Sequence, residues 1–181
     1  RLLKPGGMVF LQTPNFAAKP ASLLMGDQHY FYTPAILATI LHRHGFAFEE
    51  IESPWFPRDI LGLARVPVQP SPVRSRREPT IFECLDCLDT TARSSREVTG
   101  NDLFVLGTTI EAAFAVSTLD ERIALFVDEN PAKVGTLFHG RSVIHPGDLT
   151  DSDVVIIPYG ATANAIATKF RSRYRGCFIA V

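Results

Sequence analysis

The 181-residue sequence has little cysteine, little net charge and no long apolar run. Its three cysteines are too few for a disulfide framework, so a reducing cytoplasm is the expected compartment. The formal net charge of −1 provides no basic field that would attract nucleic acid or an anionic membrane. No apolar run reaches the roughly 18 residues that a membrane span needs. We therefore expect a cytoplasmic protein without a nucleic-acid or membrane partner.

The cysteines also form only half of a metal-binding pattern. Cys84 and Cys87 are spaced as C-x-x-C, but a structural zinc site needs a second pair and Cys177 stands alone. We interpret Cys84 and Cys87 as small residues that pack an amphipathic helix, and we expect no metal.

The chain divides by composition into three blocks. Residues 1–66 mix apolar strand-like runs with one helical pattern. Residues 67–79 contain four prolines and three arginines, a composition typical of a linker. Residues 80–181 alternate apolar runs with helical segments. We therefore predict two α/β parts, joined by the linker at 67–79.

The third block predicts a parallel sheet. Apolar runs of strand length occur at 102–107, 122–130, 142–145, 153–160 and 177–181. Helical segments at 108–119 and 161–174 separate some of these runs, and another at 80–98 precedes them. Strands that are apolar throughout and alternate with helices are typical of a parallel sheet that is covered on both faces. The prediction is a small Rossmann-like domain.

The first block opens with a turn, a strand and a helix. Lys4-Pro5-Gly6-Gly7 favours a turn, and residues 8–11 form a short apolar run. Thr33 is a candidate N-cap before Pro34, which suits the first helical position, and Gly45 favours the helix end. Strands are expected at 46–52 and 60–66.

Two series of motifs resemble methyltransferases. The first block has LKPGG before an apolar strand, then TPN, and then H-Y-F-Y-T-P, which opens a helix that ends in H-G-F. This series resembles the C-terminal half of class I S-adenosylmethionine-dependent methyltransferases. In that family the LKPGG-type turn precedes the fifth strand of a seven-stranded sheet. The segment that corresponds to H-Y-F-Y-T-P opens the last helix, and G-F starts the sixth strand. In the third block, F-V-D-E-N-P-x-K-x-G before G-R-S-V-I-H-P resembles the C-terminal domain of sugar C-methyltransferases, which act on nucleotide-linked deoxysugars and related small acceptors.

The resemblance implies a fold class and a function. The fold is α/β, with a partial methyltransferase Rossmann-like sheet in 1–66 and a small parallel Rossmann-like domain in 80–181. The family binds S-adenosylmethionine at a glycine-rich loop and an acidic residue that would both lie upstream of Arg1. The implied function is part of a methyltransferase for a small-molecule acceptor such as a nucleotide-linked sugar. Without the donor-binding front half, this part is expected to be inactive by itself.

The opening strand is then expected at a free sheet edge. An unpaired edge presents a row of N–H and C=O groups that can pair with another chain. A homo-oligomer through this edge strand is the partner prediction.

His29, Tyr30 and Tyr32 are the candidate residues of the first block. An imidazole titrates near neutral pH and suits a base that takes a proton from the acceptor. The resemblance places a histidine of this segment near the acceptor, with Tyr30 and Tyr32 lining its pocket. The structural alternatives are a His29 that fixes the turn by bonding a loop carbonyl and tyrosines that only pack.

Gly107, Thr108 and Asp128 are the candidate substrate-binding residues of the third block. Asp128 lies 21 residues after Gly107, which is the spacing of a dinucleotide fingerprint. Thr109 stands where the second glycine is needed, and Glu111 brings negative charge to the phosphate position, so tight NAD binding is not expected. The candidate ligand is part of a substrate nucleotide or sugar. Alternatively, Gly107 only permits a turn, Thr108 or Thr109 caps the helix and Asp128 caps its own turn.

A second functional hypothesis belongs to another class. The chain is then a non-catalytic module that binds a nucleotide-sugar or assembles with another subunit through its C-terminal domain. A glycine-rich donor loop encoded in frame before Arg1 would favour the enzyme, and its absence would favour the module.

Overall fold

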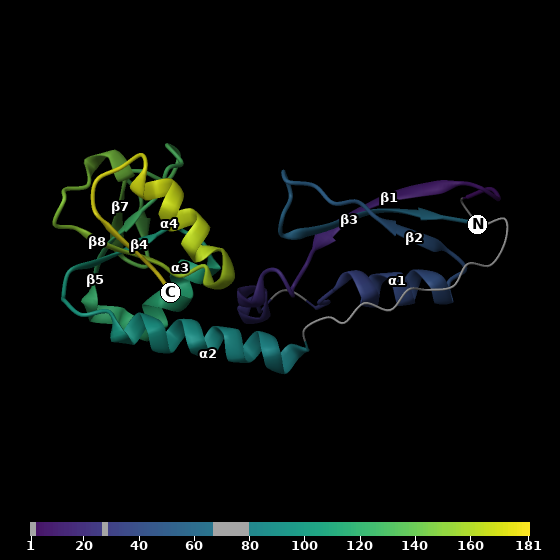
Figure 1. The fold of residues 1–181 in the computed structure, drawn as a ribbon, viewed down its shortest axis with the longest axis horizontal. Helices are drawn as coiled ribbons and strands as arrows, with labels where there is room; N and C mark the ends of the chain where they lie inside the picture. The colour runs from purple at the N-terminus through teal and green to yellow at the C-terminus, as the bar shows by residue number, and fades with distance from the viewer. Residues whose placement is uncertain (1–2, 27–28, 67–79) are drawn as a thin grey trace. The chain divides into compact units, whose positions relative to one another are not determined.

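The computed structural model describes residues 3–26, 29–66 and 80–181 (Figure 1). The chain forms two compact units, Arg1–Cys84 and Leu85–Val181, and each is described by itself. The division falls inside the long helix α2 (Ile81–Glu97). The linker predicted at 67–79 lies outside the described residues.

The first unit contains a three-stranded sheet and a helix. Its elements are β1 (Met8–Pro14), a short 3-10 helix η1 (Pro20–Leu24), α1 (Pro34–Arg43), β2 (Ala47–Glu50) and β3 (Asp59–Arg65). The strand order is β1-β3-β2, and β3 is antiparallel to both neighbours. The last strand in the chain therefore lies in the middle of the sheet, and β1 and β2 run in the same direction.

Local sequence signals define α1 and its contact with the sheet. The Ile36 N–H donates to Thr33 Oγ1 at 3.3 Å, which confirms the predicted cap, and Pro34 occupies the first helical position. The helix runs along the sheet in Figure 1. In the sheet, Gly62 leaves room for an aromatic ring, because a Cβ there would lie 2.3 Å from the ring of Phe48.

The second unit is a mixed α/β domain. After α2 come β4 (Leu103–Leu106), α3 (Ile110–Leu119), η2 (Asp120–Arg122), β5 (Ile123–Val127), β6 (Leu137–Phe138), β7 (Arg141–Ile144), η3 (Pro146–Asp148), β8 (Val154–Ile157), η4 (Gly160–Thr162), α4 (Ala163–Arg171) and β9 (Cys177–Ala180). The six-stranded sheet has the order β6-β7-β5-β4-β8-β9. All pairings are parallel except that of β6 with β7. This architecture is compatible with a Rossmann-like fold. The short strand β6 was not predicted.

Both faces of the second sheet are buried, which explains the continuous apolar runs. On one face, α3 places Ala112, Ala115 and Leu119 in a core that includes Val105 and Phe126. On the other face, α4 contributes Ala163, Ala167 and Phe170 to a core that includes Val155 and Phe178. Because successive strand residues point to opposite faces, every position of a doubly covered strand favours an apolar side chain.

The strand order creates one topological switch point, which we call the crevice, at the carboxyl ends of the strands. From β4 the chain passes through α3 to β5 on one side, and it later reaches β8 on the other side of β4. The connections that follow β4 and β8 therefore leave in opposite directions. Open α/β sheets bind ligands at such a switch point. Here the residues after β4 and β8 flank that position.

Arg122 donates hydrogen bonds to main-chain carbonyls in and just beyond the last turn of α2. Its Nε donates to the Gly100 carbonyl at 3.2 Å, and its Nη1 donates to the Arg96 carbonyl at 3.4 Å. Its Nη2 donates to the carbonyls of Val98 and Gly100. Carbonyls at a helix end lack partners inside the helix, and a cation is favourable there.

We expect Arg122→Ala to lower the free energy of unfolding of the second unit by about 1–3 kcal/mol, because several hydrogen bonds to a charged donor are lost. Arg93→Ala is the matched control, since Arg93 is exposed and pairs with Asp89 at 2.7 Å on the same helix. Arg93→Ala should change the free energy of unfolding by no more than about 0.5 kcal/mol. Urea unfolding followed by hydrogen exchange of the α2 amides compares the two variants, and equal losses would contradict the role of Arg122.

Candidate functional site

The segment that carries the candidate base lies beside the carboxyl end of β1. Asn15 and Tyr32 form a parallel bridge, and the Phe16 N–H donates to the Tyr32 carbonyl at 3.2 Å. Asn15 Oδ1 accepts a hydrogen bond from the Ala17 N–H at 3.1 Å, which fixes the turn after the strand. Main-chain bonds therefore hold the residues before α1 against the end of β1.

His29, Tyr30 and Tyr32 are close in this segment but differ in burial. His29 is exposed and has no hydrogen bond to another described residue, so the predicted alternative of a bond to a loop carbonyl is not observed there. The exposed fraction of Tyr30 is 70%, and its ring stacks on that of half-buried Tyr32 with centroids 6.2 Å apart. The imidazole is thus accessible for proton transfer, and its role as base remains a prediction.

In the second unit the structure brings Gly107, Thr108 and Asp128 together. The Gly107 N–H donates to the Val127 carbonyl at 2.7 Å, which places the turn after β4 against the end of β5. Thr108 Oγ1 donates to Asp128 Oδ2 at 2.9 Å. Asp128 Oδ1 accepts from the Asn130 N–H at 2.9 Å, so the predicted turn-capping role is present. Each carboxylate oxygen retains a lone pair for a ligand.

The prediction that Thr108 or Thr109 caps α3 is confirmed for the position of Thr109, but neither hydroxyl bonds to the helix. Thr109 occupies the N-cap position without a side-chain capping bond. Its hydroxyl lies 3.3 Å from Tyr159 Oη instead, and Thr108 bonds to Asp128. Both hydroxyls therefore link the turn after β4 to neighbouring strand ends rather than to the helix.

Tyr159 was missed by the sequence analysis, and it lies directly over Gly107. Gly107 has a φ of +87°, and a Cβ there would lie 2.1 Å from Tyr159 Oη. The glycine thus permits both the left-handed turn and the approach of the hydroxyl. The available signal was the position of Tyr159 near the end of the predicted parallel strand at 153–160, because such strand ends meet at one edge.

The contact between Tyr159 and Gly107 bears on the choice of ligand. In a dinucleotide site this turn must admit a pyrophosphate, whereas here a tyrosine hydroxyl covers it. Glu111 is also buried in the first turn of α3. The described polar groups around this turn include the hydroxyls of Thr108, Thr109 and Tyr159 and the carboxylate of Asp128. Such groups suit the hydroxyls of a sugar or ribose better than an anion.

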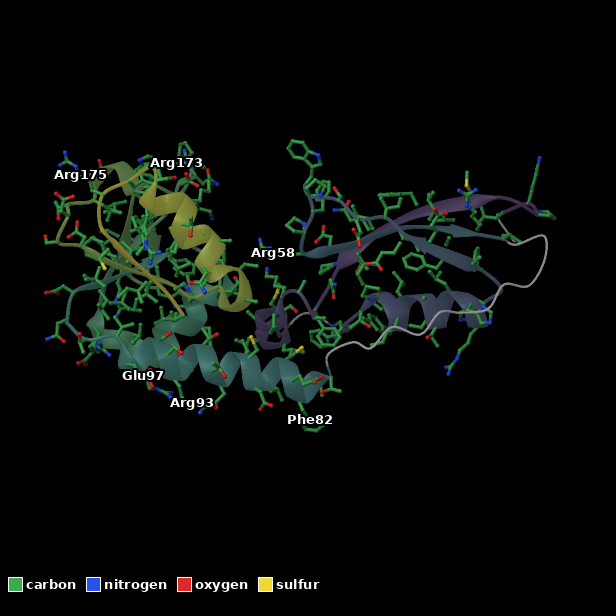
Figure 2. The ribbon with its side chains drawn as sticks, in the orientation of Figure 1. Arg58, Phe82, Arg93, Glu97, Arg173 and Arg175 are labelled. Atoms are coloured by element: carbon green, nitrogen blue, oxygen red, sulfur yellow. The ribbon has the colours of Figure 1, made fainter. Side chains whose placement is uncertain are left out.

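Glu129, next to Asp128, ties the loop after β5 to the end of α4. Its Oε1 accepts from Arg173 Nη1 at 2.7 Å and from Tyr174 Oη at 3.0 Å, and Lys169 Nζ lies 3.4 Å from Oε2; Arg173 is labelled in Figure 2. Burial raises the pKa of Glu129, but the Tyr174 hydrogen bond and the two cations outweigh burial and lower it below its usual value. Burial and the bond to Glu129 raise the pKa of Tyr174. These contacts, which we call the Glu129 clamp, tie the loop that carries Asp128 to residues in and just after α4.

Comparison with protein-family models and with curated proteins gives no match in either case. Within residues 3–26, 29–66 and 80–181, no three histidine, cysteine or acidic residues are grouped so that they could hold a metal ion. Across the same described part of the chain, no helix combines the length and apolar character needed to cross a membrane.

Gly107→Ala should destabilise the second unit more than Gly135→Ala. Both glycines have positive φ, but a Cβ at Gly135 would meet nothing within 4 Å. We expect about 1–2 kcal/mol for the left-handed backbone at Gly135, and about 1–3 kcal/mol more at Gly107 because Tyr159 must move. Adding Tyr159→Phe to Gly107→Ala should restore part of the loss. Thermal unfolding of the four proteins measures this, and equal losses at both glycines would show that Tyr159 does not press on Gly107.

The stabilisation by Glu129 should disappear in acid. Because its pKa in the folded chain is lowered from 4.5, its contribution is present above that value and is lost as the pH falls through the lowered pKa. Glu129→Gln should therefore unfold more easily than the native chain at neutral pH, and the difference should shrink as the pH falls below 4.5. Glu121→Gln, at an exposed position, is the control. Urea unfolding across this pH range gives the comparison, and a pH-independent difference would contradict the clamp.

Proposed function

We propose that this chain is part of an S-adenosylmethionine-dependent methyltransferase that acts on a small acceptor such as a nucleotide-linked sugar. The observation that carries the proposal is the order of elements in the first unit. The LKPGG turn ends directly before β1, Thr33-Pro34 begins α1, and Gly45-Phe46 stands directly before β2. The resemblance assigns these positions to the fifth strand, the last helix and the sixth strand, and β3 then counts as the seventh.

The residues that the structure describes, 3–26, 29–66 and 80–181, do not fit a donor site. The turn from a parallel strand into a helix at Gly107 is the arrangement closest to a donor-binding loop, and Tyr159 covers it. No step through the donor is therefore assigned to these residues. We propose that the donor is held by residues outside the 181 and that this chain contributes acceptor binding and proton removal.

The chain's own chemistry then rests on two groups of residues. His29 is the proposed base, because an exposed imidazole can take the proton that the acceptor loses as it gains a methyl group. Thr108 and Asp128 are the proposed binding residues, since their hydroxyl and carboxylate can exchange hydrogen bonds with sugar or ribose hydroxyls. Positioning of the acceptor is the main source of rate in such a transfer.

A non-catalytic binding module is the second candidate. The observation that favours it is that Thr108, Asp128 and Tyr159 are assembled within the second unit alone. Such a crevice can recognise a nucleotide-sugar without any donor site.

Binding measurements on the chain test the acceptor role. We expect UDP-glucose or dTDP-glucose to bind and S-adenosylhomocysteine not to bind in calorimetric titrations. Asp128→Asn should weaken sugar-nucleotide binding by about tenfold or more, or about 1.4 kcal/mol, because it removes the charged acceptor for ligand hydroxyls. Asp151→Asn, an equal charge change at an exposed loop position, should leave binding unchanged.

Three outcomes would contradict parts of this proposal. Clear binding of S-adenosylhomocysteine would place a donor site on these residues. Failure of both sugar nucleotides to bind would remove the acceptor role for this ligand class. Equal effects of the Asp128 and Asp151 substitutions would move the binding site away from the crevice.

A further inference from the structure

Three of the four outer sheet edges in the described chain carry features that discourage pairing with another strand. On β9, the Phe178 carbonyl points away from β8 and accepts a hydrogen bond from Arg171 Nη2. On β2, two consecutive glutamates, Glu49 and Glu50, form half of a four-residue strand. The strand β6 has only two residues. Side-chain capping, charge and shortness are the usual ways to protect an edge.

The edge of β1 differs from these three. The Asn15 N–H donates to the Arg58 carbonyl, and the Val66 N–H donates to the Gly7 carbonyl, so the odd-numbered residues bond toward β3. In an antiparallel ladder the intervening residues direct their main-chain groups away from the partner. The N–H and C=O groups of Met8, Phe10 and Gln12 therefore face the open side of β1.

The exposed side chains along this edge include Met8 and Phe10, which are apolar, and Gln12, whose Nε2 donates to Asp59 Oδ2 at 2.7 Å. Met8 is 51% exposed and Phe10 is 58% exposed, and the sequence of β1 contains no charged residue. The part of β1 that is open to pairing is also limited at both ends. Tyr32 bridges Asn15 at the carboxyl end, and Gly6, with a φ of +75°, turns the chain at the amino end. A strand can therefore pair with Met8–Gln12 but not much beyond.

We propose that, in the 181-residue chain on its own, the open edge of β1 pairs antiparallel with β1 of a second copy. In the matching register, Phe10 lies opposite the partner's Phe10, and Met8 lies opposite the partner's Gln12. Each outward N–H of this stretch then meets an outward carbonyl of the other strand. The two phenylalanines form a cross-strand aromatic pair, and no like charges meet.

A second copy fits this edge for two reasons. The register is self-complementary about Phe10, which is what a two-fold interface requires. The glutamates of β2 oppose pairing at the other edge of the same sheet, so association stops at a dimer. This pairing of two β1 strands is independent of the proposed function. A donor-binding sheet that joined β1 would use the same edge and would therefore prevent the dimer.

Sedimentation analysis over a range of concentrations tests the pairing. The native chain should change from monomer to dimer. Phe10→Lys places two ammonium groups opposite each other and should raise the dimer dissociation constant by about tenfold or more. Phe10→Pro removes the outward main-chain N–H of residue 10 and leaves the hydrogen bonds from β1 to β3, because an edge strand tolerates proline. It should raise the dimer dissociation constant as Phe10→Lys does. Thr39→Lys adds the same charge at an exposed position of α1 and should leave the dimer unchanged.

Hydrogen exchange identifies the surface even if a variant fails to fold. In the native chain, the amides of Met8, Phe10 and Gln12 should exchange more slowly as concentration rises, while those of Val9 and Leu11, already bonded to β3, should not change. A monomer at every concentration would overturn the proposal, as would a dimer that both Phe10 substitutions leave intact. Open-ended oligomers instead of a dimer would overturn the two-fold register.

Discussion

The position of β4 in the middle of the second sheet decides which polar groups meet. Its neighbours are β5, which follows it through α3, and β8, which the chain reaches only after β6 and β7. The turns at Gly107 and Tyr159 therefore approach each other across the crevice, and Asp128 joins them from the end of β5. These three residues are far apart in sequence, and only this strand order brings them together.

The crevice is occupied by the chain's own hydroxyl where a dinucleotide site is open. Gly107 serves two needs at once, since its φ of +87° favours glycine and the Tyr159 hydroxyl leaves no space for a Cβ. The described groups that meet around Gly107 are hydroxyls and one carboxylate, which offer hydrogen bonds to a ligand. For the proposed nucleotide-linked acceptor, these groups favour the sugar part over the phosphates.

Most elements followed from the sequence because their signals are local. The apolar run at 153–160 and the Thr33-Pro34 cap led to β8 and α1. The order β1-β3-β2 did not follow, because an apolar run does not identify its neighbour in the sheet. The sequence placed a threonine at the N-cap of α3, but it did not indicate the partners of the threonine hydroxyls, for a related reason. The partner of Thr108 is Asp128, 20 residues away, and a local rule favours the adjacent helix.

The difference between local signals and long-range pairing also applies to the candidate residues. Gly107, Thr108 and Asp128 were identified because each stands at a predicted strand end, which is a local property. Tyr159 stands at an equivalent position, but its importance depends on β8 lying beside β4. The clamp of Glu129 with Lys169, Arg173 and Tyr174 likewise depends on the path of α4 across the sheet. Sequence patterns gave candidates, and tertiary pairing decided which of them interact.

The two units differ in how complete their sheets are. The second sheet has helices on both faces and an arginine that caps the open carbonyl of β9. In the described part of the first unit, a three-stranded sheet with the helix α1 leaves Met8 and Phe10 exposed on an edge strand. Small sheets gain much of their stability from what covers their apolar face. An added strand, whether from a second copy or from a donor-binding sheet, supplies both the missing hydrogen bonds and part of that cover. The edge of β1 is therefore where assembly and stability of the first unit are coupled.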